Sequence, residues 1–182
     1  PKAAQTITFA NPGAQNFGTN PDLSVLGGGA SATSGLPVTF TSATTGVCTI
    51  TSAGVLTFVT AGICTINADQ AGDSAYLAAT QMSQSFTVNA IVPGAPTIGT
   101  AVAGDTQASV AFTAPTNTGG TTITGYTVTV SPPDMAPVNG AASPIVVNGL
   151  TNGQAYTFTV TADNSAGTSP PSAASNSVTP AA

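Results

Sequence analysis

Short runs of alternating hydrophobic and polar residues recur along the whole chain, and Gly, Pro, Asn and Asp separate them. No segment keeps a 3.6-residue apolar period, and residues two positions apart share one face of a strand. The pattern therefore predicts an all-β protein. In the first half we expect strands at residues 6–10, 38–41, 47–51, 55–60, 63–67 and 83–89. In the second half we expect them at residues 97–103, 107–113, 123–131, 143–148, 155–163 and 173–179.

Turn signals divide the chain further. Gly27-Gly28-Gly29, Ser34-Gly35 and Ser52-Ala53-Gly54 mark turns, and residues 69–80 are the one stretch in which a short helical turn is expected. Pro93-Gly94-Ala95-Pro96 blocks both helix and central strand, so a domain boundary falls here. We predict two tandem immunoglobulin-like β-sandwich domains, 1–89 and 90–182, joined by a short Pro-containing linker.

The composition argues against several classes of function. Charged residues make up 4% of the 182 residues, with one Lys, six Asp and no Glu, Arg or His. General acid–base catalysis needs such groups, so we expect no enzyme, no catalytic residue and no cofactor. One cation cannot neutralise a row of phosphates, which argues against nucleic acid as a partner. No apolar run approaches the ~20 residues that span a bilayer, so we expect no membrane insertion.

Cys48 and Cys64 stand in twin contexts, Val47-Cys48-Thr49-Ile50 and Ile63-Cys64-Thr65-Ile66. Each cysteine faces the same way as its neighbouring Ile, so both point inward from strands and can meet at disulfide distance. The alternative is a pair of buried free thiols that act as small hydrophobic side chains. We predict the disulfide, because the other features of the chain suggest an oxidising compartment. Two sulfurs without His cannot complete a tetrahedral zinc site.

The acidic residues offer little chemistry. Asp69 and Asp73, with Asn67 nearby, are weak candidates for a cation, because Ca²⁺ takes six or more oxygens and the loop lacks the alternating acidic pattern of an EF-hand. Capping a turn is the commoner role of such residues, so no metal site is predicted. The other four Asp residues are dispersed along the chain, and no pair supports a carboxylate couple.

Several motifs of the second half together resemble a fibronectin type III domain. They are Ala108-Ser109-Val110-Ala111-Phe112, Ile123-Thr124-Gly125-Tyr126, Leu150-Thr151-Asn152-Gly153-Gln154-Ala155-Tyr156 and Asn164-Ser165-Ala166-Gly167. The resemblance implies that Tyr156 is the corner tyrosine, whose hydroxyl caps a turn near Leu150. Phe112 stands where the family usually has Trp, which reduces the buried area of the core.

The first half is similar to the bacterial immunoglobulin-like repeats of very large secreted and surface proteins. The motifs that carry this likeness include Gln5-Thr6-Ile7-Thr8-Phe9, Leu36-Pro37-Val38-Thr39-Phe40 and Gln84-Ser85-Phe86-Thr87-Val88. The resemblance implies a non-catalytic structural repeat of an extracellular or cell-surface bacterial fibre, stalk or adhesin. The alternative is an accessory spacer module of a secreted polysaccharide-degrading enzyme.

The ends and the surface suggest partners. If Pro180 of the C-terminal Val178-Thr179-Pro180 is aligned with Pro1 of the N-terminal Pro1-Lys2-Ala3, the end of one copy continues into the start of the next. This is the pattern of a tandem array with a period of about 180 residues. A surface rich in Thr, Ser, Ala and Gly favours lateral packing through strand edges. We therefore expect neighbouring copies of the same repeat, in one chain or a filament, as partners, with surface glycans or other proteins as further ones.

Overall fold

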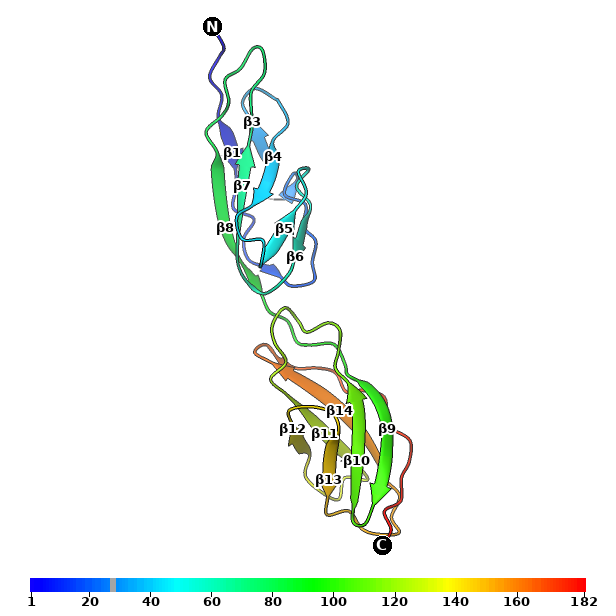
Figure 1. Cartoon of the computed structure of the whole chain (residues 1–182). Coiled ribbons are helices and arrows are strands. Elements are labelled where there is room, and N and C mark those ends of the chain that lie inside the picture. The colour runs from blue at the N-terminus through cyan, green and yellow to red at the C-terminus, as the bar shows by residue number, and fades with distance from the viewer. Residues whose placement is uncertain (27–28) are drawn as a thin grey trace. The chain divides into compact units, whose positions relative to one another are not determined.

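The computed structural model describes residues 1–26 and 29–182, and strands dominate it (Figure 1). This confirms the all-β class. The chain folds as two compact units, which we call the first unit, Pro1–Ala90, and the second unit, Ile91–Ala182. The boundary expected from the sequence lies one residue earlier. Gly27 and Gly28 of the expected Gly27-Gly28-Gly29 turn lie outside the described residues.

The second unit holds most of the expected linker. The Ile91 N–H donates to the Gly119 carbonyl at 3.0 Å, and the Gly94 N–H donates to the Asn117 carbonyl at 2.9 Å. Gly119 has a φ of +77°, and a Cβ there would lie 1.9 Å from the Ile91 oxygen, so only glycine fits. Pro93 is fully buried. Residues 91–94 therefore belong to the second fold and are not a free tether.

The described part of the first unit, residues 1–26 and 29–90, contains eight strands in three sheets. The strands are β1 Ile7–Phe9, β2 Gln15–Asn16, β3 Ala30–Ala32, β4 Thr39–Ser42, β5 Cys48–Ile50, β6 Leu56–Phe58, β7 Gly62–Asp69 and β8 Met82–Asn89. The largest sheet has the order β2-β8-β7-β4, and β1-β3 and β5-β6 form antiparallel pairs. Among these described strands, β2 alone runs parallel to a neighbour, β8.

Alternation along the strands builds the core of the first unit. Alternate side chains are buried in β7, at Cys64, Ile66 and Ala68, and at the end of β8, at Phe86 and Val88. Phe9 packs edge-on against Phe40, and Phe58 packs edge-on against Phe86, with ring centroids 5.7 and 6.3 Å apart.

The second unit contains seven strands in two sheets. The strands are β9 Thr97–Gly104, β10 Gln107–Thr113, β11 Gly125–Ser131, β12 Val138–Gly140, β13 Ile145–Asn148, β14 Thr157–Asn164 and β15 Gly167–Thr168. Their orders are β13-β10-β9 and β12-β11-β14-β15, all antiparallel. Valines of β10, β11 and β14 fill the space between the two sheets, and Phe112 lies against Tyr126 with centroids 4.7 Å apart.

Three expectations about local structure are wrong. Residues 173–179 form no strand; only Val178 makes a bridge, to Tyr156. Residues 69–80 hold no helical turn, because β7 runs to Asp69 and the following chain is tied down through a parallel bridge between Ala3 and Tyr76. The expected strands also leave out β2, β3, β12 and β15, each of which is only two or three residues long.

The buried Gln5 explains why residues 70–79 stay irregular. Its Nε2 donates to the Gln70 side chain at 2.8 Å and to the Leu77 carbonyl at 2.6 Å, and its Oε1 accepts a hydrogen bond from Ser34. One amide therefore satisfies polar groups of three segments.

Candidate functional site

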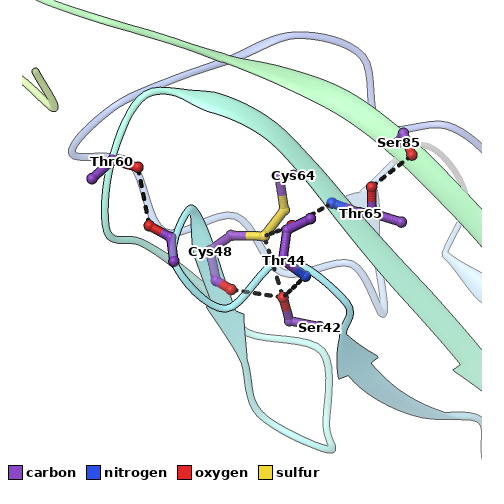
Figure 2. Close-up of a disulfide and its surroundings, with 8 residues drawn as sticks. Ser42, Thr44, Cys48, Thr60, Cys64, Thr65 and Ser85 are labelled. Atoms are coloured by element: carbon purple, nitrogen blue, oxygen red, sulfur yellow. Dashed lines mark hydrogen bonds between the residues drawn. A yellow bond between two sulfur atoms is a disulfide. The ribbon is translucent and has the colours of Figure 1, made fainter.

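A disulfide joins Cys48 and Cys64, which confirms the predicted pair (Figure 2). Both residues are fully buried, and their Cα atoms lie 5.7 Å apart. Cys48 belongs to β5 of the β5-β6 pair and Cys64 to β7 of the four-stranded sheet, so the bond crosses between two sheets. The bond joins residues 16 positions apart. Closing a loop of that length in the unfolded chain stabilises the fold by about 3 kcal/mol through chain entropy.

Hydroxyl groups surround the disulfide (Figure 2). The Ser42 hydroxyl donates to the Cys48 carbonyl at 2.7 Å, and the Thr44 hydroxyl lies 3.5 Å from the Cys48 sulfur. The Thr44 oxygen also accepts the Thr65 N–H at 2.9 Å, and the hydroxyls of Thr65 and Ser85 lie 2.8 Å apart. These contacts extend the covalent link through β4, β7 and β8. Both cysteines are committed to the bond, so neither serves as a nucleophile.

All six carboxylates of the chain accept hydrogen bonds within the fold. The donors are Ser24 for Asp22, Gln81 for Asp69, Ala75 and Tyr76 for Asp73, Asn152 for Asp105, Tyr156 for Asp134 and Thr168 for Asp163. The hydroxyl of Ser24, followed by its backbone N–H, holds the pKa of Asp22 below its ordinary value of 3.8. The carboxylates thus hold turns and connect segments.

Asp69 and Asp73, the weak cation candidates, each have a structural role. The Gln81 amide donates to both Asp69 oxygens, at 2.9 and 3.1 Å. The Asp73 Oδ1 accepts the backbone N–H groups of Ala75 and Tyr76 at 2.7 and 2.9 Å, as a turn cap does. Within residues 1–26 and 29–182, no three His, Cys, Asp or Glu side chains gather in a way that could hold a metal ion.

Tyr156 lies at the start of β14 and is fully buried apart from 1% of its surface. Its hydroxyl accepts the Thr151 N–H at 3.1 Å, next to the buried Leu150, and donates to the Asp134 carboxylate at 2.8 Å. One phenol therefore connects three segments: the turn after β13, the start of β14 and the loop between β11 and β12. The resemblance pointed to the turn near Leu150, and the bond to Asp134 is an addition from the structure.

Residues 169–178 hold β14 in an unexpected way. Ser169, Ser172 and Ser175 each donate a backbone N–H to a β14 carbonyl, at 2.8 to 2.9 Å. Each serine Oγ in turn accepts a β14 N–H, those of Ala162, Val160 and Phe158, at 2.9 to 3.0 Å. We call these three residues the serine rungs. Val178 continues the series with two backbone bonds to Tyr156.

The serine rungs explain why the expected strand at residues 173–179 does not form. The residues that face β14 recur every third position, the period of a polyproline II helix, whereas a strand has a period of two. Pro170 and Pro171 cannot donate to a ladder, and the serine hydroxyls replace the missing backbone partners. On the opposite side, the Asn176 amide exchanges two hydrogen bonds with Ala101 of β9, at 2.9 and 3.0 Å. The segment thus covers exposed strand edges of both sheets.

A hollow of about 420 Å³ lies at the β12-β11-β14 sheet of the second unit. It is shallow, and Thr124, Gly125, Thr127 and Asn139 form part of its lining. Asp163 is the one carboxylate among its lining residues, and it is bonded to Thr168. A single engaged carboxylate cannot supply the acid and the base of a hydrolytic reaction.

Comparison with known proteins bears on the second unit. Residues 92–178 match the family model described as "Fibronectin type III domain". The second unit contains a fibronectin type III domain. Such domains are generic structural modules of tandem-domain proteins and are typically non-catalytic. No curated protein matches the sequence.

Among solved structures, the chain is similar to domains A168–A170 of titin, with 17% identity and a TM-score of 0.48 over 96% of this chain and 65% of that one. The Caenorhabditis elegans twitchin kinase region is 23% identical, with a TM-score of 0.45 over 50% of this chain and 17% of that one. The fibronectin type III domain of human fibronectin type III domain containing protein 3 is 26% identical, with a TM-score of 0.43 over 50% of this chain and 89% of that one. The chain thus spans under a fifth of the twitchin structure and 65% of the titin one.

Two observations bear on location. In the described parts of the chain, no helix has the length and apolar character needed to cross a membrane. The disulfide and the fibronectin type III domain indicate an extracellular protein, because disulfides persist in oxidising environments.

Proposed function

We propose that this chain is a structural repeat of an extracellular bacterial fibre, stalk or adhesin, where it serves as a spacer that bears load without catalysis. The single observation that carries the proposal is how the chemically competent side chains are used. Both cysteines, all six carboxylates and the Tyr156 hydroxyl are bonded to backbone or side-chain groups of their own unit. A catalytic site would leave some of these groups facing a substrate.

The cross-links suit a module under tension. In the first unit, the β5-β6 pair cannot be pulled away from the four-stranded sheet without stretching the covalent bond between β5 and β7. In the second unit, residues 169–178 are bonded to β14 at every third residue, and Asn176 is bonded to Ala101 of β9. Separating this segment requires several hydrogen bonds to break before the chain gains length.

The bacterial setting rests on the first unit's likeness to bacterial immunoglobulin-like repeats. Its partners, on this proposal, are neighbouring copies of the same repeat, with surface glycans or other proteins as further contacts. The low charge fits close lateral packing, since one Lys and six Asp give little repulsion between copies.

Immunogold electron microscopy of the native source, with antibodies against both units, tests this function. We expect label along surface fibres or stalks, together with further copies of the two units in the full reading frame. Label on a secreted polysaccharide-degrading enzyme would support the accessory-module alternative. Hydrolytic turnover by the purified chain would overturn both.

A further inference from the structure

The second unit contains three Asn-Gly pairs, at Asn139-Gly140, Asn148-Gly149 and Asn152-Gly153. In such a pair the backbone nitrogen of the glycine can attack the asparagine side-chain amide, because glycine has no Cβ to shield it. Asparagine is for this reason among the chemically labile residues of proteins. Since the three pairs share the same chemistry, the fold decides which of them reacts.

The fold protects two of the pairs. The Asn152 side chain donates to Asp105 at 2.8 Å and accepts the Thr106 N–H at 2.9 Å, while the attacking Gly153 N–H donates to the Pro180 carbonyl at 2.9 Å. The Asn139 Oδ1 accepts the Thr127 hydroxyl at 2.9 Å. Both Asn139 and Gly140 lie in β12 and pair with β11, which fixes the backbone between them.

Asn148-Gly149 is exposed like Asn152-Gly153 but lacks the hydrogen bonds that hold the other two pairs. Asn148 is the last residue of β13, and both residues of the pair are exposed. Within the described part of the chain, no hydrogen bond involves the Asn148 amide group or the Gly149 N–H. Gly149 and Gly153 both have a φ of +84°, and a Cβ built on either would meet nothing within 4 Å. The missing hydrogen bonds, not the backbone geometry, therefore distinguish Asn148-Gly149 from Asn152-Gly153.

We infer that Asn148 is a site of spontaneous covalent modification, at which water converts the side-chain amide to an acid. The Gly149 nitrogen forms a bond to the Asn148 Cγ, the Cγ–N bond to the amide breaks, and ammonia leaves with the proton. Water then opens the resulting succinimide at either carbonyl and gives aspartate or isoaspartate. Asparagine and water are consumed and ammonia is released, with no oxidant or cofactor.

The position gives the modification a structural consequence. Each event adds one negative charge to a chain with a formal net charge of -5, which carries one Lys. Isoaspartate would also lengthen the backbone between β13 and the turn whose Thr151 N–H binds Tyr156. In a long-lived extracellular protein, Asn148 would therefore record the age of each copy.

The test is a time course of the whole folded chain at mildly alkaline pH, with a parallel sample unfolded in urea. Chymotrypsin is the suitable protease, because the single Lys gives trypsin almost no cleavage site. Mass spectrometry in ¹⁸O-labelled water assigns each new acid to Asn139, Asn148 or Asn152. Asn148→Gln is the test variant, Asn152→Gln is its matched control, and Asp105→Ala releases Asn152 from its carboxylate partner.

In the folded chain we expect Asn148 to react on the order of tenfold faster than either other asparagine, since one hydrogen bond lost is worth about one decade. In urea the three rates should converge. Asn148→Gln should abolish most of the early acid formation, Asn152→Gln should change little, and Asp105→Ala should raise the rate at Asn152. Equal rates in the folded chain, or Asn152 or Asn139 reacting first, would overturn the inference.

Discussion

In the first unit one covalent bond joins the β5-β6 pair to the four-stranded sheet, whereas in the second unit side-chain hydrogen bonds perform the corresponding task. The first unit buries the cystine among phenylalanines. The second unit has no cysteine and relies on Tyr156 and the serine rungs. Both units are about 90 residues long, a size at which one core leaves a narrow margin of stability.

This difference shows that the two units depend on different conditions. A disulfide responds to reductants and hardly at all to pH or salt. The serine rungs are neutral, so they should not respond to pH or salt. They stabilise the second unit only while the buried N–H groups of β14 keep the serine oxygens as acceptors. Perturbations should therefore act on one unit and spare the other.

Replacing both Cys48 and Cys64 with Ala should have the largest effect. We expect a loss of about 3 kcal/mol in the free energy of unfolding of the first unit, because the unfolded chain is no longer closed into a loop. Amide hydrogen exchange of the whole chain, read separately on peptides of each unit, measures it. Exchange in the second unit should not change, and an equal loss in both units would show that they do not fold independently.

Tyr156→Phe should weaken the second unit by about 1–3 kcal/mol, because the Asp134 carboxylate and the Thr151 N–H both lose the hydroxyl of a buried side chain as a partner. Tyr76→Phe is the matched control: this ring is only half-buried and belongs to the first unit. Chemical denaturation of both variants gives the comparison. Equal effects would contradict a special role of the corner hydroxyl.

Ser172→Ala should cost about 1 kcal/mol or slightly more, since the buried Val160 N–H loses its acceptor. The exposed Ser165 gives the control variant Ser165→Ala. Hydrogen exchange at Val160 itself is the sharpest measurement. Undiminished protection of that amide in Ser172→Ala would mean that the rung contributes nothing.

Asp22 should give the smallest effect. Because its pKa is lowered on folding, the carboxylate stabilises the first unit above pH 3.8, and this contribution disappears as the pH falls through the lowered pKa. An NMR titration should place the midpoint of Asp22 below 3.8 and, in Ser24→Ala, closer to that ordinary value. An unchanged midpoint in Ser24→Ala would argue against the Ser24 hydroxyl as the main cause.

Alternation alone predicted both cores, because inward positions recur every second residue regardless of what lies opposite. It located β10 at residues 107–113 and placed Cys48 and Cys64 on inward faces. The turn role of Asp73 also follows from its local sequence, since the bonded N–H groups lie two and three residues away.

Alternation could not predict the serine rungs, because serine is typical of loops and the rungs recur with a period of three, whereas alternation has a period of two. The spacing of Ser169, Ser172 and Ser175 around Pro170 and Pro171 is the signal that would have found them. The Tyr156–Asp134 bond joins residues 22 positions apart and depends on how two loops meet. Such contacts belong to tertiary structure alone.

Pulling the chain by its two ends with single-molecule force spectroscopy tests the load-bearing claim most directly. We predict two separate resisted unfolding events, one per unit. Adding a reductant should lengthen the first unit's event by roughly 50 Å, from the 16-residue separation of Cys48 and Cys64, and leave the other unchanged. Extension of either unit without a measurable resisting force would contradict the account.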